Sequence, residues 1–117
     1  MSKSDSPNLK KLTEDYIRLF GSKDLRGVEG LLLEGFVLED PIVKRIEGKK
    51  RALEAIQAIF ESCKTLTFSA KNLYQDGATT VIEFSLKLDE TLLQGVDIIE
   101  WEGSKMTALR AYLDVPK

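Results

Sequence analysis

Three polar residues interrupt apolar stretches of this sequence, and their side chains are of the kinds that move protons. They are Tyr16 in "DYIRLF", Asp40 in "FVLEDP" and Asp97 in "LLQGVDIIEW". The chain of 117 residues contains no histidine, which excludes Ser-His-Asp and Cys-His catalysis and every histidine metal site. Acid–base chemistry would therefore have to use Asp, Glu, Tyr, Lys or the single cysteine.

Asp40 ends a short apolar run that Pro41 stops. Side chains alternate between the two faces of a strand, so Asp40 shares a face with Phe36 and Leu38. If that face is internal, a carboxylate is carried toward the core. The structural interpretation is a turn or capping residue, which is the common role of an aspartate before proline.

Asp97 lies on the more apolar of two alternating faces, together with Leu93, Ile99 and Trp101. Aspartate is disfavoured in mid-strand and costly to bury, so a functional role competes with an edge position or a structural hydrogen bond. Tyr16 falls at the centre of a helical stripe of apolar residues. There the structural interpretation is core packing with the hydroxyl tied to a partner.

The composition excludes several classes of protein. The net charge of −2 and the absence of a basic block argue against nucleic acid as a partner. One cysteine cannot form an internal disulfide, and we find no secretory signal, membrane span, phosphate loop or metal-ligand cluster. We therefore expect a cytoplasmic protein without cofactor or membrane contact. We also expect a disordered tail over residues 1–6 and one domain over residues 7–117.

Helical periodicity predicts helices over 7–20 and 49–63. Asp24 can cap a second, shorter helix whose inner stripe runs from Leu25 to Leu32. A strand follows over 36–40, and we expect a loop over 42–48.

A period of two then predicts four strands, joined by an Asp-Gly turn at 76–77 and a second turn at 102–104. The strands are expected over 66–75, 78–88, 91–101 and 105–114. Helices that precede a run of hairpin-linked strands define an α+β fold.

These elements together resemble those of the NTF2-like superfamily, in the branch of SnoaL-like polyketide cyclases and ketosteroid isomerases. The resemblance rests on "DYIRLFGSKDLRGVEGLL", "FVLEDPI", "GKKRALEAIQAIF" and "GVDIIEWEGSKMTALRAYLD". It implies a cone-shaped, curved antiparallel sheet packed on three N-terminal helices, as in the cystatin-like α+β barrel. It also implies a deep apolar pocket and a homodimer formed through the outer sheet face.

The resemblance further implies a role for each polar residue. Asp40 corresponds to the general base of ketosteroid isomerases, and Tyr16 and Asp97 correspond to the two donors of their oxyanion hole. As a donor, Asp97 would have to stay protonated, which its apolar face favours. The ligand would be a small apolar compound, steroid-like or polyketide-like. We expect the pocket wall to include Phe20, Phe36, Leu38, Phe60, Phe84, Leu86, Ile99 and Trp101.

Three functions remain open at this point. The first is a cofactor-free isomerase of steroid delta-isomerase type, which moves a double bond next to a ketone. The second is a polyketide-cyclase-like ring closure or a hydrolysis with Asp40 as base. The third is a non-enzymatic ligand-binding or dimerisation module, in which Asp40 is structural and pairs with Lys44 or Arg45.

Overall fold

The computed structural model describes residues 7–40 and 44–114, and for Asp40 the backbone only. The tail expected over residues 1–6 lies outside this range. Three helices and six strands follow one another in the order α1, α2, β1, β2, α3, β3, β4, β5, β6. The α+β class is therefore confirmed.

The three helices begin at recognisable signals in the sequence. α1 spans Leu9–Gly21, and the Asn8 side chain caps it by accepting a hydrogen bond of 3.1 Å from the backbone N–H of Lys11. α2 spans Leu25–Glu29 and is capped by Asp24 in the same way. α3 spans Lys49–Glu61 and follows Gly48, whose φ of 101° suits glycine.

The strands form one curved sheet in the order β2-β1-β6-β5-β4-β3, with β2 and β3 at its open edges. Their bounds are β1 Leu32–Asp40, β2 Lys44–Glu47, β3 Leu66–Asp76, β4 Thr79–Leu88, β5 Thr91–Glu102 and β6 Lys105–Asp114. The strands expected after residue 65 are confirmed to within a residue or two. All neighbouring pairs are antiparallel except β1 and β6, which run parallel.

The structure corrects three expectations about the first half of the chain. The second helix ends at Glu29, before its expected inner residue Leu32, because Gly27 and Gly30 weaken the helix. Leu32 instead begins β1, opposite Met106 of β6. Residues 44–47 are not a loop but the edge strand β2, and the β1–β6 pair makes the sheet mixed rather than wholly antiparallel.

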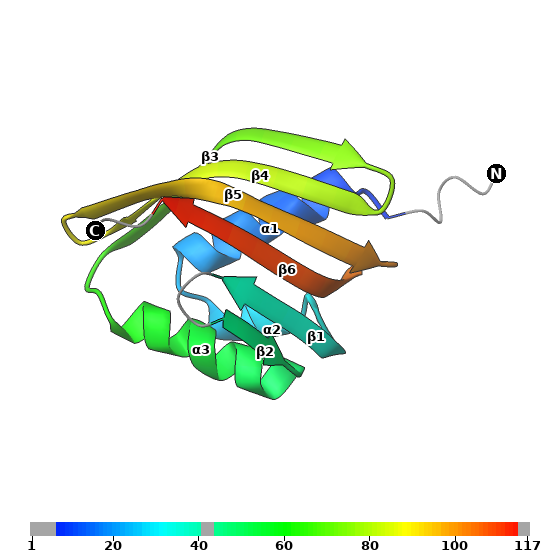
Figure 1. The fold of residues 1–117 in the computed structure, drawn as a ribbon, viewed down its shortest axis with the longest axis horizontal. Coiled ribbons are helices and arrows are strands. Elements are labelled where there is room, and N and C mark those ends of the chain that lie inside the picture. Colours follow the sequence, from blue (N-terminus) through cyan, green and yellow to red (C-terminus); the bar gives the residue numbers. More distant parts are fainter. Residues whose placement is uncertain (1–6, 41–43, 115–117) are drawn as a thin grey trace.

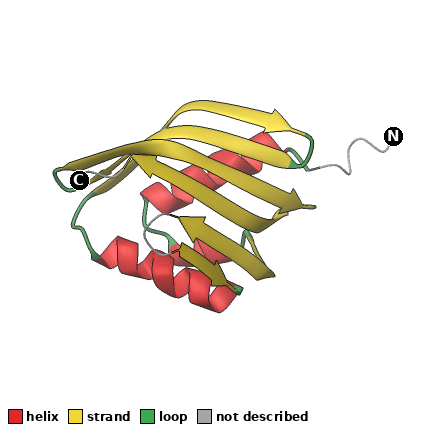
Figure 2. Ribbon diagram, in the orientation of Figure 1, coloured by secondary structure: helices red, strands yellow, loops and turns green. Residues whose placement is uncertain are grey.

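The helices lie against the hollow face of the curved sheet (Figures 1 and 2). α1 packs across β3 and β4, whereas α3 packs against β1 and β2. Between them lies a cluster of aromatic rings from both helices and the sheet. Phe68 and Phe84 have ring centroids 4.9 Å apart, and Phe20 lies 5.1 Å from both Phe60 and Phe68.

A buried chain of hydrogen bonds ties α1 to the sheet. The Trp101 indole donates to the Thr80 hydroxyl over 2.9 Å, and the Thr80 and Thr13 hydroxyls are 2.9 Å apart. The Thr13 hydroxyl donates to the carbonyl of Leu9 over 2.7 Å. Since Thr13 gives its only proton to that carbonyl, Thr80 donates to Thr13, and every member has a partner.

None of the helices in residues 7–40 and 44–114 is long and apolar enough to cross a membrane.

Candidate functional site

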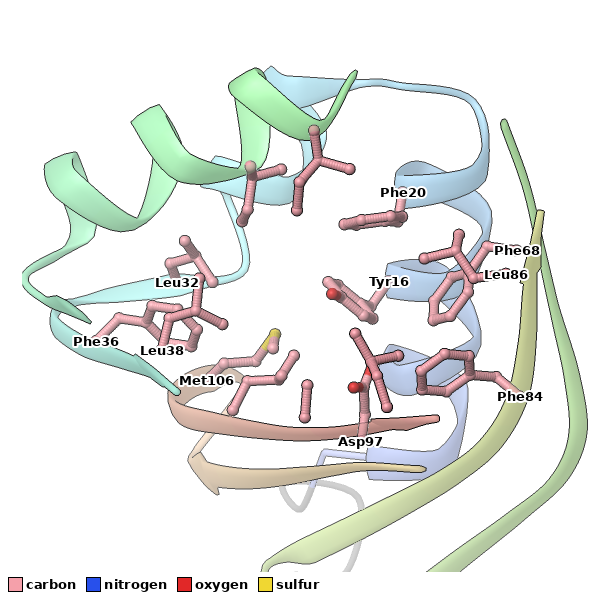
Figure 3. Close-up of a pocket in the computed structure, with 15 residues that line it drawn as sticks. Tyr16, Phe20, Leu32, Phe36, Leu38, Phe68, Phe84, Leu86, Asp97 and Met106 are labelled. Carbon is pink, nitrogen blue, oxygen red and sulfur yellow. The ribbon is translucent and has the colours of Figure 1, made fainter. Parts of the chain in front are cut away.

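An apolar cavity lies where α1 and α3 face the sheet, and the side chains of both Tyr16 and Asp97 line it (Figure 3). Its volume is about 70 Å³. This is room for on the order of five water molecules. The rest of the wall is apolar and comes from helices α1 and α3 and strands β1, β3, β4 and β6 together.

Tyr16 enters the cavity from α1. Its ring packs against Phe20 and Phe68, with centroids 5.8 and 6.1 Å away, and the side chain is 4% exposed. No hydrogen bond joins its hydroxyl to another of the described residues. Among these residues, no fully enclosed side-chain nitrogen or oxygen lacks a partner. The Tyr16 hydroxyl therefore faces the open volume of the cavity, and Figure 3 shows its oxygen directed there.

Asp97 enters the cavity from β5, on the inner face of the sheet. Its register partners are Ile82 of β4 and Ala111 of β6, and it is 5% exposed. Figure 3 shows its carboxyl group directed into the same space as the Tyr16 hydroxyl. A helix residue and a strand residue 81 positions apart in the chain thus share one small apolar cavity.

The cavity perturbs the acid–base properties of Tyr16. Burial raises the pKa of the Tyr16 hydroxyl well above its ordinary value, and a negative charge on Asp97 would raise this pKa further. The hydroxyl therefore keeps its proton at neutral pH and can act only as a hydrogen-bond donor or acceptor, not as a base.

Asp40 ends β1, with its Cα opposite that of Lys44 in β2. Its side chain lies outside the described residues. Two earlier residues of the same strand, Phe36 and Leu38, line the cavity. The end of β1 at Asp40 therefore lies two residues beyond Leu38, a residue of the cavity wall.

Five of the eight apolar residues expected in the wall line the cavity: Phe20, Phe36, Leu38, Phe84 and Leu86. Phe60, Ile99 and Trp101 are buried in the core elsewhere. Phe60 packs on Phe20 from α3, and Trp101 donates to Thr80. Alternation assigns a residue to a face, but it does not tell how far along that face a cavity extends.

Eight wall residues were not anticipated. They are Leu32, Ile56, Ile59, Phe68, Met106, Leu109, Ala111 and Leu113. Apolar periodicity indicates that most of them are internal. The four that lie on β6 reach the cavity through the parallel pairing of β6 with β1, for which the sequence carries no local signal.

Among the described residues, no group of three or more Cys, Asp and Glu side chains is arranged to hold a metal ion.

The fold and this cavity define the class of the protein as an α+β domain in which three helices and a curved sheet line an apolar site. The model of the SnoaL-like domain family matches residues 13–109, and the chain belongs to that family. This confirms the resemblance drawn from the sequence. No curated protein matches the sequence.

Solved structures share the fold at low sequence identity. One, described as a candidate ketosteroid isomerase from Kribbella flavida, is 20% identical with a TM-score of 0.80, over 92% of this chain and 78% of that one. A candidate SnoaL-like polyketide cyclase from Shewanella denitrificans is 15% identical with a TM-score of 0.77, over 89% and 88%. An LEH-like epoxide hydrolase from M. tuberculosis is 19% identical with a TM-score of 0.75, over 90% and 81%. These likenesses concern the fold, which hosts different chemistries.

Proposed function

We propose that this protein is a cofactor-free isomerase that moves a carbon–carbon double bond into conjugation with a ketone. The observation that carries the proposal is the convergence of Tyr16 and Asp97 in one apolar cavity. Two donors placed together in a site of low polarity can stabilise a negative charge that develops on a ketone oxygen. The family membership and the similar structure described as a candidate ketosteroid isomerase also support it.

In the proposed reaction, the Asp40 carboxylate removes a proton from the carbon between the ketone and the double bond. The electron pair of that C–H bond forms a dienolate, whose oxygen accepts hydrogen bonds from the Tyr16 hydroxyl and from protonated Asp97. The Asp40 carboxylic acid then returns the proton two carbons further along, at the far end of the former double bond. Substrate and product have the same composition, so the reaction consumes no other reagent.

The size of the cavity limits the part of the substrate that it encloses. Pockets that enclose drug-sized ligands have volumes of about 300–1,000 Å³, several times the volume found here. We therefore propose a compact ring, such as a cyclohexenone, as the enclosed part rather than a whole steroid.

We also propose that the protein forms a homodimer and lies in the cytoplasm. Sedimentation velocity checks the first, since a dimer would sediment as a particle of twice 13.1 kDa.

An absorbance assay with a β,γ-unsaturated cyclohexenone tests the function, because the conjugated product absorbs more strongly in the ultraviolet. Wild type is expected to form it faster than buffer does, and Asp40→Asn is expected to lose this activity. Asp76→Asn, at the end of β3, removes an exposed carboxylate from another strand end and should behave as wild type. Equal rates for wild type and Asp40→Asn would contradict the proposal.

A β,γ-unsaturated 3-ketosteroid in the same assay separates the alternatives. Turnover of the steroid but not of the cyclohexenone would show that the cavity opens to admit a larger body. Binding of either ketone without turnover would favour a cyclase-like or hydrolytic enzyme or a binding module.

A further inference from the structure

One wall residue, Ala111 of β6, has a much smaller side chain than the residues around it, and it lies beside Asp97. The two residues are register partners on the sheet face that lines the cavity. Leu109 and Leu113, two residues before and after Ala111 on the same face of β6, line the cavity with longer side chains. Ala111 therefore leaves a recess between two leucines, next to Asp97.

The other three sides of Asp97 on this sheet face are filled. Its register partner Ile82 of β4 and its β5 neighbour Ile99 are both 0% exposed. Gly95, two residues before Asp97, has no side chain, but a Cβ there would lie 3.1 Å from a methyl carbon of Leu113. Leu113 already occupies that space, so the open volume beside Asp97 lies over the alanine of β6.

The cavity also comes closest to solvent at this place. Ile59, Ala111 and Leu113 are half-buried, whereas every other residue of the cavity wall is buried. Ile59 belongs to α3, and the other two lie at the end of β6. A ligand that enters between α3 and β6 therefore passes over Ala111 before it reaches Asp97.

The proposed base lies at the end of the strand on the other side of Ala111. β6 runs between β5 and β1 (Figure 1). β1 pairs with β6 as far as Glu39 and Arg110, so the backbone of Asp40, the next residue, comes level with Ala111. The backbones of β5 and β1, one on each side of β6, are about 10 Å apart. A ring held between Asp97 and the end of β1 must lie across Ala111.

We propose that Ala111 is the specificity-determining residue of the site. Its methyl group forms the floor under the ring of the ketone and sets the largest ring that can reach Asp97 and Tyr16. A larger side chain would fill the volume beside Asp97, whereas glycine would deepen it. A hydrophobic pocket discriminates about 10–200-fold between ligands that differ by one methylene group, so one or two methyl groups at this position can change the ring that is accepted.

The inference rests on the proposed function for the identity of the ketone, but binding of the ring can be measured without turnover. The test is an NMR titration with two conjugated ketones, cyclohexenone and a bicyclic octalone in which a second six-membered ring is fused to the same enone. Ala111→Val is expected to weaken binding of cyclohexenone about tenfold or more. Ala111→Gly is expected to shift the ratio of the two affinities about tenfold toward the octalone, relative to wild type.

Ala108→Val is the matched control, because it makes the same change in the same strand on the other face of the sheet. Ala108 is the register partner of Glu100 and does not line the cavity. This variant should bind both ketones as wild type does. Circular dichroism checks that each variant is folded, and Ala111→Gly decides the test if Ala111→Val does not fold, since it adds no bulk.

An affinity ratio that Ala111→Gly leaves unchanged would overturn the inference, and so would a folded Ala111→Val protein that binds cyclohexenone as wild type does. If binding follows the size of residue 111 but no β,γ-unsaturated cyclohexenone is isomerised, the role of Ala111 stands and the proposed reaction fails. If the cyclohexenone is isomerised but the variants at residue 111 show the ring preference of wild type, the proposed reaction stands and the role of Ala111 fails.

Discussion

Tyr16 brings a polar hydroxyl into a wall that is otherwise almost entirely apolar. Since burial raises its pKa well above the ordinary value, the hydroxyl stays protonated over the whole physiological range. In the proposed reaction its loss should cost about 10²–10³ in kcat, the usual effect of removing one oxyanion donor. Tyr16→Phe is thus expected to retain the fold but little activity. Tyr74→Phe, on an exposed part of β3, should match wild type in the cyclohexenone assay.

The raised pKa of Tyr16 also links stability to pH. The folded protein resists ionisation of this hydroxyl, whereas the unfolded chain ionises it near the ordinary tyrosine pKa of about 10. The contribution of the Tyr16 hydroxyl to the free energy of unfolding is therefore fully present below about pH 10. It is lost as pH rises from there toward the folded-state pKa. We predict that the free energy of unfolding falls less steeply above pH 10 in Tyr16→Phe than in wild type. The measurement is denaturant titration at each pH, and a free energy of unfolding that falls equally steeply in both proteins would refute this.

The effect of Asp40→Asn on stability distinguishes an enzyme from a binding module. A carboxylate kept for proton abstraction is not optimised for stability, so Asp40→Asn should leave the free energy of unfolding unchanged or raise it. A structural carboxylate, paired with Lys44 or Arg45, would instead cost about 1–3 kcal/mol when replaced. Urea denaturation of wild type, Asp40→Asn and Asp76→Asn measures the difference.

At the scale of elements, α1 carries Tyr16 and is fixed to the sheet by the Thr13–Thr80–Trp101 hydrogen bonds. Thr13 and Thr80 are both 0% exposed. Thr80→Val keeps the shape but leaves the Trp101 N–H without its acceptor, so we expect a loss of about 1–3 kcal/mol in stability. Thr80→Ser restores the hydroxyl and should recover part of it. A Thr80→Val protein as stable as wild type would show that these bonds do not hold α1.

β5 carries Asp97 and needs a glycine two residues earlier. A Cβ at Gly95 would lie 2.3 Å from the carbonyl oxygen of Tyr112 in β6, where neither backbone can yield easily. We expect Gly95→Ala to destabilise the protein by about 1–3 kcal/mol. Gly35→Ala on β1 is the matched control, since its Cβ would meet nothing within 4 Å. Thermal unfolding of both variants checks this, and equal midpoints would contradict the close approach.

Much of the fold was predictable because it follows local patterns. The alternation in 79–88 and 91–102 and the apolar stripes of α1 and α3 indicate their elements directly. β2 was missed because "KRIE" is short, polar and stabilised only by its pairing with β1. Leu32 was assigned to the wrong element because its apolar side chain suits a helix stripe and a strand equally well.

The polar residues of the site could be predicted from the sequence, but its apolar wall could be predicted only in part. Tyr16 and Asp97 stood out because each is a polar residue on an apolar face, and the structure places both at one cavity. Met106 and Leu109 could not be assigned to it, since β6 lies beside β1 only through a parallel contact between distant segments.

The molecule as a whole packs its helices and its curved sheet around an apolar cavity that a small ligand could occupy. A ligand that binds only the folded state raises stability by RT ln(1 + [L]/Kd), about 2.7 kcal/mol at a hundred times Kd. We predict that a conjugated cyclohexenone, the product of the proposed reaction, raises the unfolding midpoint of wild type. In Tyr16→Phe the increase should be smaller, because one hydrogen-bond donor to the ketone oxygen is lost. An unchanged midpoint in wild type would contradict binding of the ketone in the cavity.

The central claim is that Tyr16 and Asp97 donate hydrogen bonds to one ketone oxygen. The most direct measurement is the ¹³C NMR shift of a carbonyl-labelled cyclohexenone bound to the protein. Two donors in an apolar cavity should polarise the carbonyl and move its resonance downfield of the value in water. Tyr16→Phe and Asp97→Ala should each reverse part of that displacement. A bound resonance at its position in water, or one that both variants leave unchanged, would contradict the account.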